Sequence, residues 1–92
     1  MSDEITRQLP IINVKGLHAR ASAKFVDVVE RFNAEAQVEK DGMRVSGNSI
    51  MGLLMLTAPR GSSITVTTSG PQAIELADAL EALVGDYFGE GM

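Results

Sequence analysis

The hydrophobic and polar positions at the start of the chain follow first a strand-like and then a helix-like spacing. Residues 9–14 are rich in Leu, Ile and Val and stop at Lys15-Gly16, which predicts a first strand ending at a turn. From Ala19 to Phe32 the apolar positions recur every three or four residues. This spacing predicts an amphipathic helix that begins just after His18.

Two more strands and a short helix are predicted in the middle of the chain. Residues 36–40 and 43–45 alternate on either side of Asp41-Gly42, a dipeptide typical of a two-residue hairpin turn. The run Ile50–Leu56 is apolar on all sides and follows Asn48 and Ser49. We therefore expect a short helix that is capped by one of these two side chains.

The remaining pattern predicts one strand and one long helix. Residues 63–68 alternate with β-branched side chains, and Ser69-Gly70-Pro71 is typical of a helix start. The residues expected on the inward face of this helix are Ile74, Ala77, Leu80, Leu83, Val84 and Tyr87. We expect fraying at about residues 1–8 and 88–92. The order βαββαβα predicts one α+β domain over residues 1–92, with every helix on one face of an antiparallel sheet.

Composition narrows the classes of function. The 92 residues include 8 Lys+Arg against 12 Asp+Glu, and the net charge of −4 argues against a nucleic-acid partner. No cysteine is present, which excludes disulfides and thiolate chemistry and suits a cytoplasmic protein. No apolar run approaches the roughly 20 residues of a membrane-spanning helix, so neither membrane insertion nor a signal peptide is expected. With one histidine, no metal site and no cofactor are expected.

The single histidine, His18, lies at the predicted start of the first helix. Unpaired N–H groups and the positive end of the helix dipole favour an anion there, by about 0.3–1 kcal/mol when exposed. Arg20 supplies a guanidinium that can bind phosphate bidentately. A histidine that is neutral at pH 7 can act as a nucleophile. His18 is therefore a candidate phosphoryl acceptor, although the position also suits a histidine that only caps the helix.

The second predicted helix raises two similar alternatives. Ser49 fits a helix cap, and it also fits a regulated hydroxyl whose phosphorylation would add negative charge at a helix start. The apolar residues Ile50, Met51 and Leu54 fit a buried core, and they also fit an exposed patch that binds partner proteins.

Two motifs together resemble a known family. Gly16-Leu17-His18-Ala19-Arg20 is followed by Asn48-Ser49-Ile50-Met51-Gly52, with Ser49 thirty-one positions after His18. This arrangement resembles the histidine-containing phosphocarrier family, HPr, over about residues 11–83. Residues 48–56 and the helix start at residues 69–72 are similar to its nitrogen-branch subgroup, NPr. The resemblance implies an HPr-like open-faced sandwich, with three helices on one face of a four-stranded antiparallel sheet.

The resemblance also implies a function. His18 would accept a phosphoryl group at Nδ1 from enzyme I, charged by phosphoenolpyruvate, and pass it to a IIA-type protein, with assistance from Arg20. The chain would then be a stoichiometric carrier of the phosphotransferase system and not an enzyme. Ser49 matches the position that an HPr kinase/phosphorylase modifies in some members. The residues Ile50, Met51 and Leu54 match positions that dock enzyme I and IIA proteins, and a monomer is expected.

Some positions depart from the family pattern. Ala21 stands where the family commonly has Pro, which removes some preorganisation of the first helical turn but restores a backbone N–H. Asp27, Glu30 and Gly52 replace basic residues of the docking face in sugar-branch members. The choice between sugar transport and nitrogen regulation therefore stays open.

Two alternatives come from other classes of protein. A small acyl-phosphatase-like enzyme would share the size and the use of an arginine on phosphate, but we find no Gly-rich loop bearing that arginine. A regulatory interaction module would dock through Ile50, Met51 and Leu54 while His18 stays inert.

Overall fold

The computed structural model describes residues 4–92, which fold in the predicted order βαββαβα. The strands are β1 (Ile5–Pro10), β2 (Glu35–Lys40), β3 (Met43–Ser46) and β4 (Ser63–Ser69). The helices are α1 (Ala19–Glu30), α2 (Ile50–Met55) and α3 (Ala73–Gly85), followed by η1, one turn of 3-10 helix at Tyr87–Gly89.

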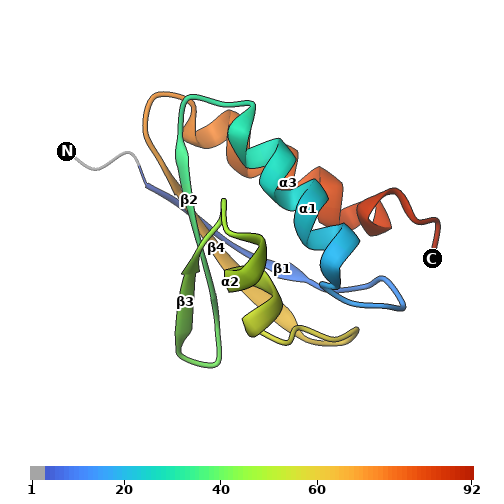
Figure 1. Ribbon diagram of the computed structural model, residues 1–92. Helices are drawn as coiled ribbons and strands as arrows, with labels where there is room; N and C mark the ends of the chain where they lie inside the picture. The colour runs from blue at the N-terminus through green and yellow to red at the C-terminus, as the bar shows by residue number, and fades with distance from the viewer. Residues whose placement is uncertain (1–3) are drawn as a thin grey trace.

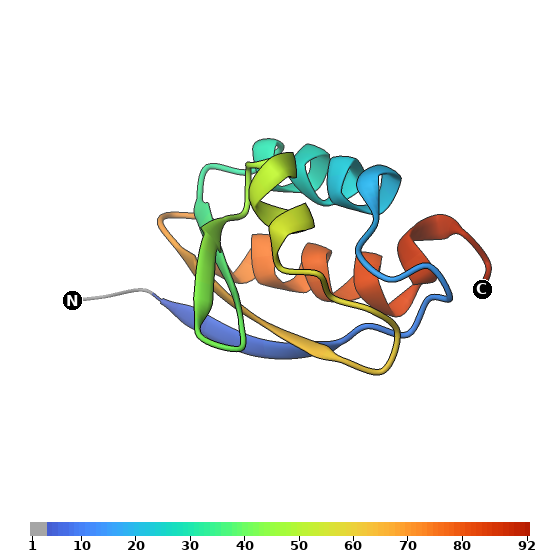
Figure 2. The ribbon, with the colours of Figure 1, turned by 60° about the horizontal axis from the view of Figure 1, so that its bottom comes forward.

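The four strands form one antiparallel sheet in the order β1-β4-β2-β3. All three helices cover the same face of this sheet, with α3 over β1 and β4 and with α2 beside β3 (Figures 1 and 2). The predicted α+β open-faced sandwich is therefore confirmed. Side chains on the opposite face, such as Gln37 and Thr67, are exposed or half-buried, as the alternation of the strands requires.

The hairpin between β2 and β3 follows its sequence pattern closely. Asp41 and Gly42 have φ angles of 51° and 84°, the left-handed conformation that a two-residue turn needs at both positions. The turn sets the register Val38↔Val45. Because side chains alternate between the two faces of a strand, this register points Val38 into the core.

The core lies between the sheet and the helices. Each strand and helix contributes apolar side chains at its own period, so the layers interlock. The largest fully buried apolar side chains are Ile11, Phe25, Val38, Leu53, Ile64, Val66, Leu76, Leu80, Val84 and Phe88. No helix within residues 4–92 has the length and apolar character needed to cross a membrane.

The first strand differs from its prediction. It begins at Ile5 instead of Leu9 and ends at Pro10 instead of Val14. The inward side of β1 includes the polar residue Arg7, so residues 5–8 lack the apolar alternation that predicts a strand. Its guanidinium binds Asp78 at 2.6 Å and Glu81 at 2.8 Å on α3. Residues 5–8, where fraying is expected, are therefore part of the sheet, and residues 1–3 of that expectation lie outside the described residues.

The end of the chain also differs from its prediction. Helix α3 begins at Ala73, after Pro71, and Ile74 is 57% exposed instead of facing inward. In the tail, where fraying is expected, Phe88 is fully buried and Glu90 is hydrogen-bonded to other parts of the chain. The tail lies beside the start of α1 (Figure 1).

Candidate functional site

The loop before α1 places His18 through a close backbone approach at Gly16. Gly16 has a φ of +66°, and a Cβ there would lie 2.5 Å from the carbonyl oxygen of Ala58. Only glycine fits this position. The next residue, Leu17, donates its N–H to the same carbonyl at 2.9 Å and is itself buried. The loop is thereby fixed, and His18 becomes the N-cap residue of α1.

The start of α1 is open to an anion. The His18 carbonyl accepts the N–H of Ser22 at 2.8 Å, but among the described residues the side chain of the N-cap residue, His18, makes no capping hydrogen bond. The N–H groups of Ala19, Arg20 and Ala21 find no acceptor within residues 4–92. Unpaired first-turn N–H groups are the donors that bind phosphate at helix starts. The ring of His18 is thus attached at the point where an anion would be held.

The His18 ring is neither sealed in the core nor free in solvent. Its side chain is 25% exposed, and its Nε2 atom is hydrogen-bonded to Oε2 of Glu90, whose side chain is 16% exposed. Burial by itself raises the pKa of Glu90, but hydrogen bonds from Asn13 and His18 and the nearby charges of His18 and Lys15 outweigh it. The pKa of Glu90 therefore lies below its ordinary value of 4.5.

Asn13 holds the other oxygen of this carboxylate. Its buried Nδ2 donates to Oε1 of Glu90 at 3.0 Å and to the Gly16 carbonyl at 2.8 Å. Both partners are acceptors, so they fix which way the amide faces. Within residues 4–92 the buried Oδ1 of Asn13 has no partner, an arrangement that costs about 1–3 kcal/mol. Despite this cost, the hydrogen bond from Asn13 holds the Glu90 carboxylate beside His18.

The conformation of the segment after α3 places Glu90 next to His18. Phe88 is fully buried, and its carbonyl accepts a hydrogen bond from Nζ of Lys24 at 2.6 Å. Tyr87 and Phe88 have left-handed φ angles of 56° and 53°, which are costly for non-glycine residues and persist only where packing imposes them. The chain therefore turns back after α3 and brings Glu90 to the start of α1.

Within residues 4–92, no hydrogen bond joins Arg20 to His18, and the two side chains line different hollows. The exposed Arg20 lines a cavity of about 420 Å³, which His18 does not line. His18 lines a separate, shallower hollow of about 370 Å³ with Thr57 and Pro59. The cavity beside Arg20 gathers three cations in a chain of net charge −4, and it is lined by Val14, Lys15, Arg20, Lys24, Gly89, Glu90 and Met92.

Ser49 occupies the start of α2 as its N-cap. Its hydroxyl accepts the N–H of Gly52 at 3.0 Å, so the predicted capping role is confirmed and Asn48 does not cap the helix. A Cβ on Gly52 would lie 3.0 Å from the Cβ of Val45, which leaves little room for a side chain at this position.

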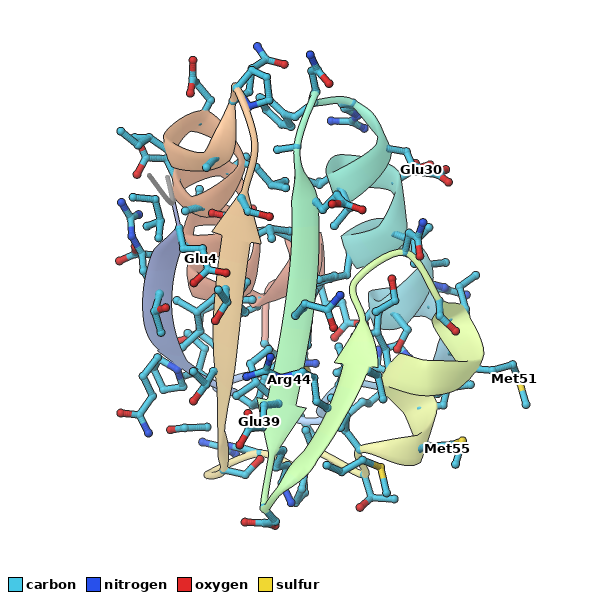
Figure 3. All side chains as sticks on the ribbon, turned by 90° about the vertical axis from the view of Figure 1, so that its left-hand side faces the viewer. Glu4, Glu30, Glu39, Arg44, Met51 and Met55 are labelled. Atoms are coloured by element: carbon cyan, nitrogen blue, oxygen red, sulfur yellow. The ribbon has the colours of Figure 1, made fainter. Side chains whose placement is uncertain are left out.

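The exposed apolar patch on α2 differs in part from the expected one. Ile50 is 40% and Met51 70% exposed, but Leu54 is half-buried. Met55, which the sequence analysis did not single out, is 60% exposed and points outward beside Met51 (Figure 3). We define the α2 patch as Ile50, Met51, Leu54 and Met55.

Sequence reasoning missed four residues around His18, namely Asn13, Lys15, Lys24 and Glu90. The tail did contain one signal, since Phe88 is a large apolar residue flanked by Gly85 and Gly89. Because a large aromatic side chain gains much from burial, Phe88 could have indicated that the segment next to Glu90 packs against the core.

Comparisons with known proteins agree with this geometry. Residues 5–86 match the family model described as "PTS HPr component phosphorylation site". The phosphocarrier protein HPr of Cupriavidus necator is 45% identical over 95% of this chain and 98% of its own, and the phosphocarrier protein NPr of Shewanella violacea is 38% identical over 95% and 96%. A crystal structure of HPr from Thermoanaerobacter tengcongensis has a TM-score of 0.91 at 34% identity, covering 96% of this chain and 99% of that one. The chain therefore belongs to the HPr family, the phosphoryl carriers of the phosphotransferase system, and it is a carrier whose partners are proteins of that system, not an enzyme.

Proposed function

We propose that His18 is the residue that carries the phosphoryl group. The group would be received from enzyme I, charged by phosphoenolpyruvate, and passed to a IIA-type protein. The observation that supports this role best is the open start of α1. Three N–H groups there lack an acceptor within residues 4–92, whereas the start of α2 is capped by Ser49. A phosphoryl group on the ring would supply the missing anion.

Arg20 is proposed to assist the transfer. Its guanidinium forms no ion pair within residues 4–92, and it lies on the same helical turn as the three open N–H groups. A rotamer change would bring it to a phosphoryl group on His18, where it could bind two oxygens at once. Phosphoryl transfer depends mainly on positioning and on stabilisation of charge, and these groups supply both.

The test is stoichiometric labelling. Incubation with enzyme I and radiolabelled phosphoenolpyruvate should give acid-labile, base-stable phosphate at one per chain, and His18→Ala should remain unlabelled. Arg20→Ala should accept label more slowly than Arg31→Ala, a matched change at the other end of α1. Full labelling of His18→Ala would exclude His18 as the acceptor.

The α2 patch is proposed as the surface that docks enzyme I and IIA proteins. It exposes flexible Met side chains on the helix that packs against α1, the helix that begins after His18. Ile50→Glu should therefore abolish exchange of phosphate with partner proteins. Ile74→Glu is a matched control, because Ile74 is the same residue type and is also exposed, at 57% against 40% for Ile50, but lies on α3. Equal exchange by both variants would exclude the patch.

Ser49 is proposed as a second, regulatory phosphorylation site. Its hydroxyl is half-buried at the edge of the α2 patch, so a phosphate there would place negative charge in the docking surface. Incubation with ATP and an HPr kinase/phosphorylase should label the chain at Ser49 and slow labelling of His18. Absence of label, or label on Ser49→Ala, would remove this proposal.

The remaining parts of the proposal concern the cell and the assembly. A cytoplasmic monomer suffices for the role, since one chain supplies every residue of the proposed site. Sedimentation and cell fractionation test these two points. A transfer assay with IIA proteins of the sugar and nitrogen branches identifies the branch that this carrier serves.

A further inference from the structure

We propose that Glu90 is a positioning residue for His18, whose carboxylate keeps the proton on Nε2 and leaves the lone pair on Nδ1 for phosphorus. This inference rests on the proposed role of His18 and deepens it. Glu90 touches neither phosphate nor partner in this scheme. It acts only through the imidazole ring.

The contact itself determines where the proton lies. Nε2 of His18 and Oε2 of Glu90 form a hydrogen bond, and an ionised carboxylate can only accept. The carboxylate is ionised at neutral pH, because the hydrogen bonds from Asn13 and His18 favour its charged form despite burial. Nε2 must then be the donor. A neutral ring with its proton on Nε2 has its lone pair on Nδ1, which makes no hydrogen bond within residues 4–92.

Several independent contacts hold Glu90 in this place. Asn13 binds the second carboxylate oxygen and is itself fixed by the Gly16 carbonyl. Phe88 anchors the segment in the core, and Lys24 binds its carbonyl. A tail packed only by chance would not retain left-handed Tyr87 and Phe88 or the unpaired buried oxygen of Asn13. The arrangement has the features of a built support for the ring.

The chemistry of transfer explains why a carboxylate is useful on Nε2. The lone pair of Nδ1 forms a bond to phosphorus, while the donor's bond to phosphorus breaks and its electron pair stays with the donor. The ring thereby gains positive charge and keeps its Nε2 proton, and the carboxylate of Glu90 stabilises that charge. When the phosphoryl group leaves for an acceptor, the electron pair returns to Nδ1 and the ring is neutral again.

The surrounding charges favour a fixed carboxylate over a mobile one. Lys15, Arg20 and Lys24 line the cavity next to Glu90, so the carboxylate lies among cations on one side and the ring on the other. The two nitrogens of an imidazole point away from each other. Glu90 on Nε2 therefore leaves the position of a phosphoryl group on Nδ1 free.

The test compares the wild-type chain with Glu90→Gln and with Glu4→Gln. Glu4 is exposed beside β4 (Figure 3) and precedes β1, whereas the loop that leads to His18 follows the other end of β1, so the Glu4 variant loses the same charge without touching His18. NMR of isotopically labelled histidine reports the tautomer of the ring. We expect the Nε2–H form in the wild type and in Glu4→Gln. Glu90→Gln should show a raised share of the Nδ1–H form, because an amide can donate to Nε2.

Two further readouts complete the test. Glu90→Gln should accept phosphate from enzyme I at least about tenfold more slowly, with an unchanged folded spectrum. Chemical labelling with phosphoramidate needs no partner, and it should give Nδ1-phosphohistidine in the wild type and an added Nε2 product in Glu90→Gln. An unchanged tautomer or an unchanged rate in Glu90→Gln would overturn the role of Glu90 alone. A labelled His18→Ala would instead overturn the proposed function.

Discussion

His18 and Ser49 occupy equivalent positions at the starts of α1 and α2, but only Ser49 caps its helix. Each is the N-cap residue of a helix and has an extended backbone conformation itself. Each also precedes N–H groups that have no acceptor within the helix. Ser49 satisfies one of them with its hydroxyl, whereas His18 satisfies none. The residue type at the cap thus decides whether a helix start is closed or remains available to an anion.

A proline at position 21 tests how open the first turn of α1 is. The N–H of Ala21 has no acceptor within residues 4–92, so its loss in Ala21→Pro costs no hydrogen bond. The variant should therefore raise the free energy of unfolding by about 0.4–1 kcal/mol, through lower entropy of the unfolded chain. Urea denaturation measures this change. The control Ala23→Pro removes a bond inside the helix and should lower stability by about 3 kcal/mol. A destabilised Ala21→Pro would mean that the N–H of Ala21 is engaged.

At the scale of elements, local patterns predicted well where one face is consistently apolar. Helix α1, the β2–β3 hairpin and β4 lie within a few residues of their predicted bounds. The misplaced element, β1, has Arg7 on its inward side, paired with carboxylates of α3 that no local pattern reveals. In α3 the predicted inward residues Ala77, Leu80 and Val84 are buried, but Ile74 at the start of the helix is exposed, and Ala73 and Leu76 are buried instead. Tertiary contacts decided both cases.

Helix α2 depends on its cap more than the longer helices do. It has six residues, too few to be stable without help from packing or capping. Ser49→Ala removes the acceptor of the Gly52 N–H and should lower the free energy of unfolding by about 0.5–2 kcal/mol. Ser49→Thr keeps a hydroxyl and should recover most of the loss. Thermal or denaturant unfolding of the three proteins measures the series, and a Ser49→Ala curve that overlays the wild type would show that the cap contributes nothing.

At the scale of the whole molecule, the proposed site joins segments that are far apart in the sequence, namely the loop before α1 and the segment after α3. His18 and Ser49 were predictable because their motifs are local. Glu90 was not, because its place depends on Phe88 entering the core and on Lys24 binding the tail. Its partner Asn13 was likewise assigned to a strand by composition, although it lies in the loop that precedes α1. Sequence motifs therefore predict the residues of such a site that lie in one local segment, but not the residues that only tertiary contacts bring to it.

The contact of Glu90 with Asn13 and His18 should affect how the free energy of unfolding depends on pH. The pKa of Glu90 is lower in the folded chain than its ordinary value of 4.5, so the folded state favours the ionised carboxylate. The unfolded chain then binds more protons in this range, and stability rises with pH. The contribution of Glu90 is complete above about pH 4.5 and is lost as the pH falls through the lowered pKa. Urea denaturation from neutral pH downwards should therefore show a steeper acid loss of stability in the wild type than in Glu90→Gln, whereas Glu4→Gln should follow the wild type. Parallel curves of stability against pH for the wild type and Glu90→Gln would mean that Asn13 and His18 do not hold the carboxylate in solution. The segment after α3 would then not be joined to the loop before α1 at this point.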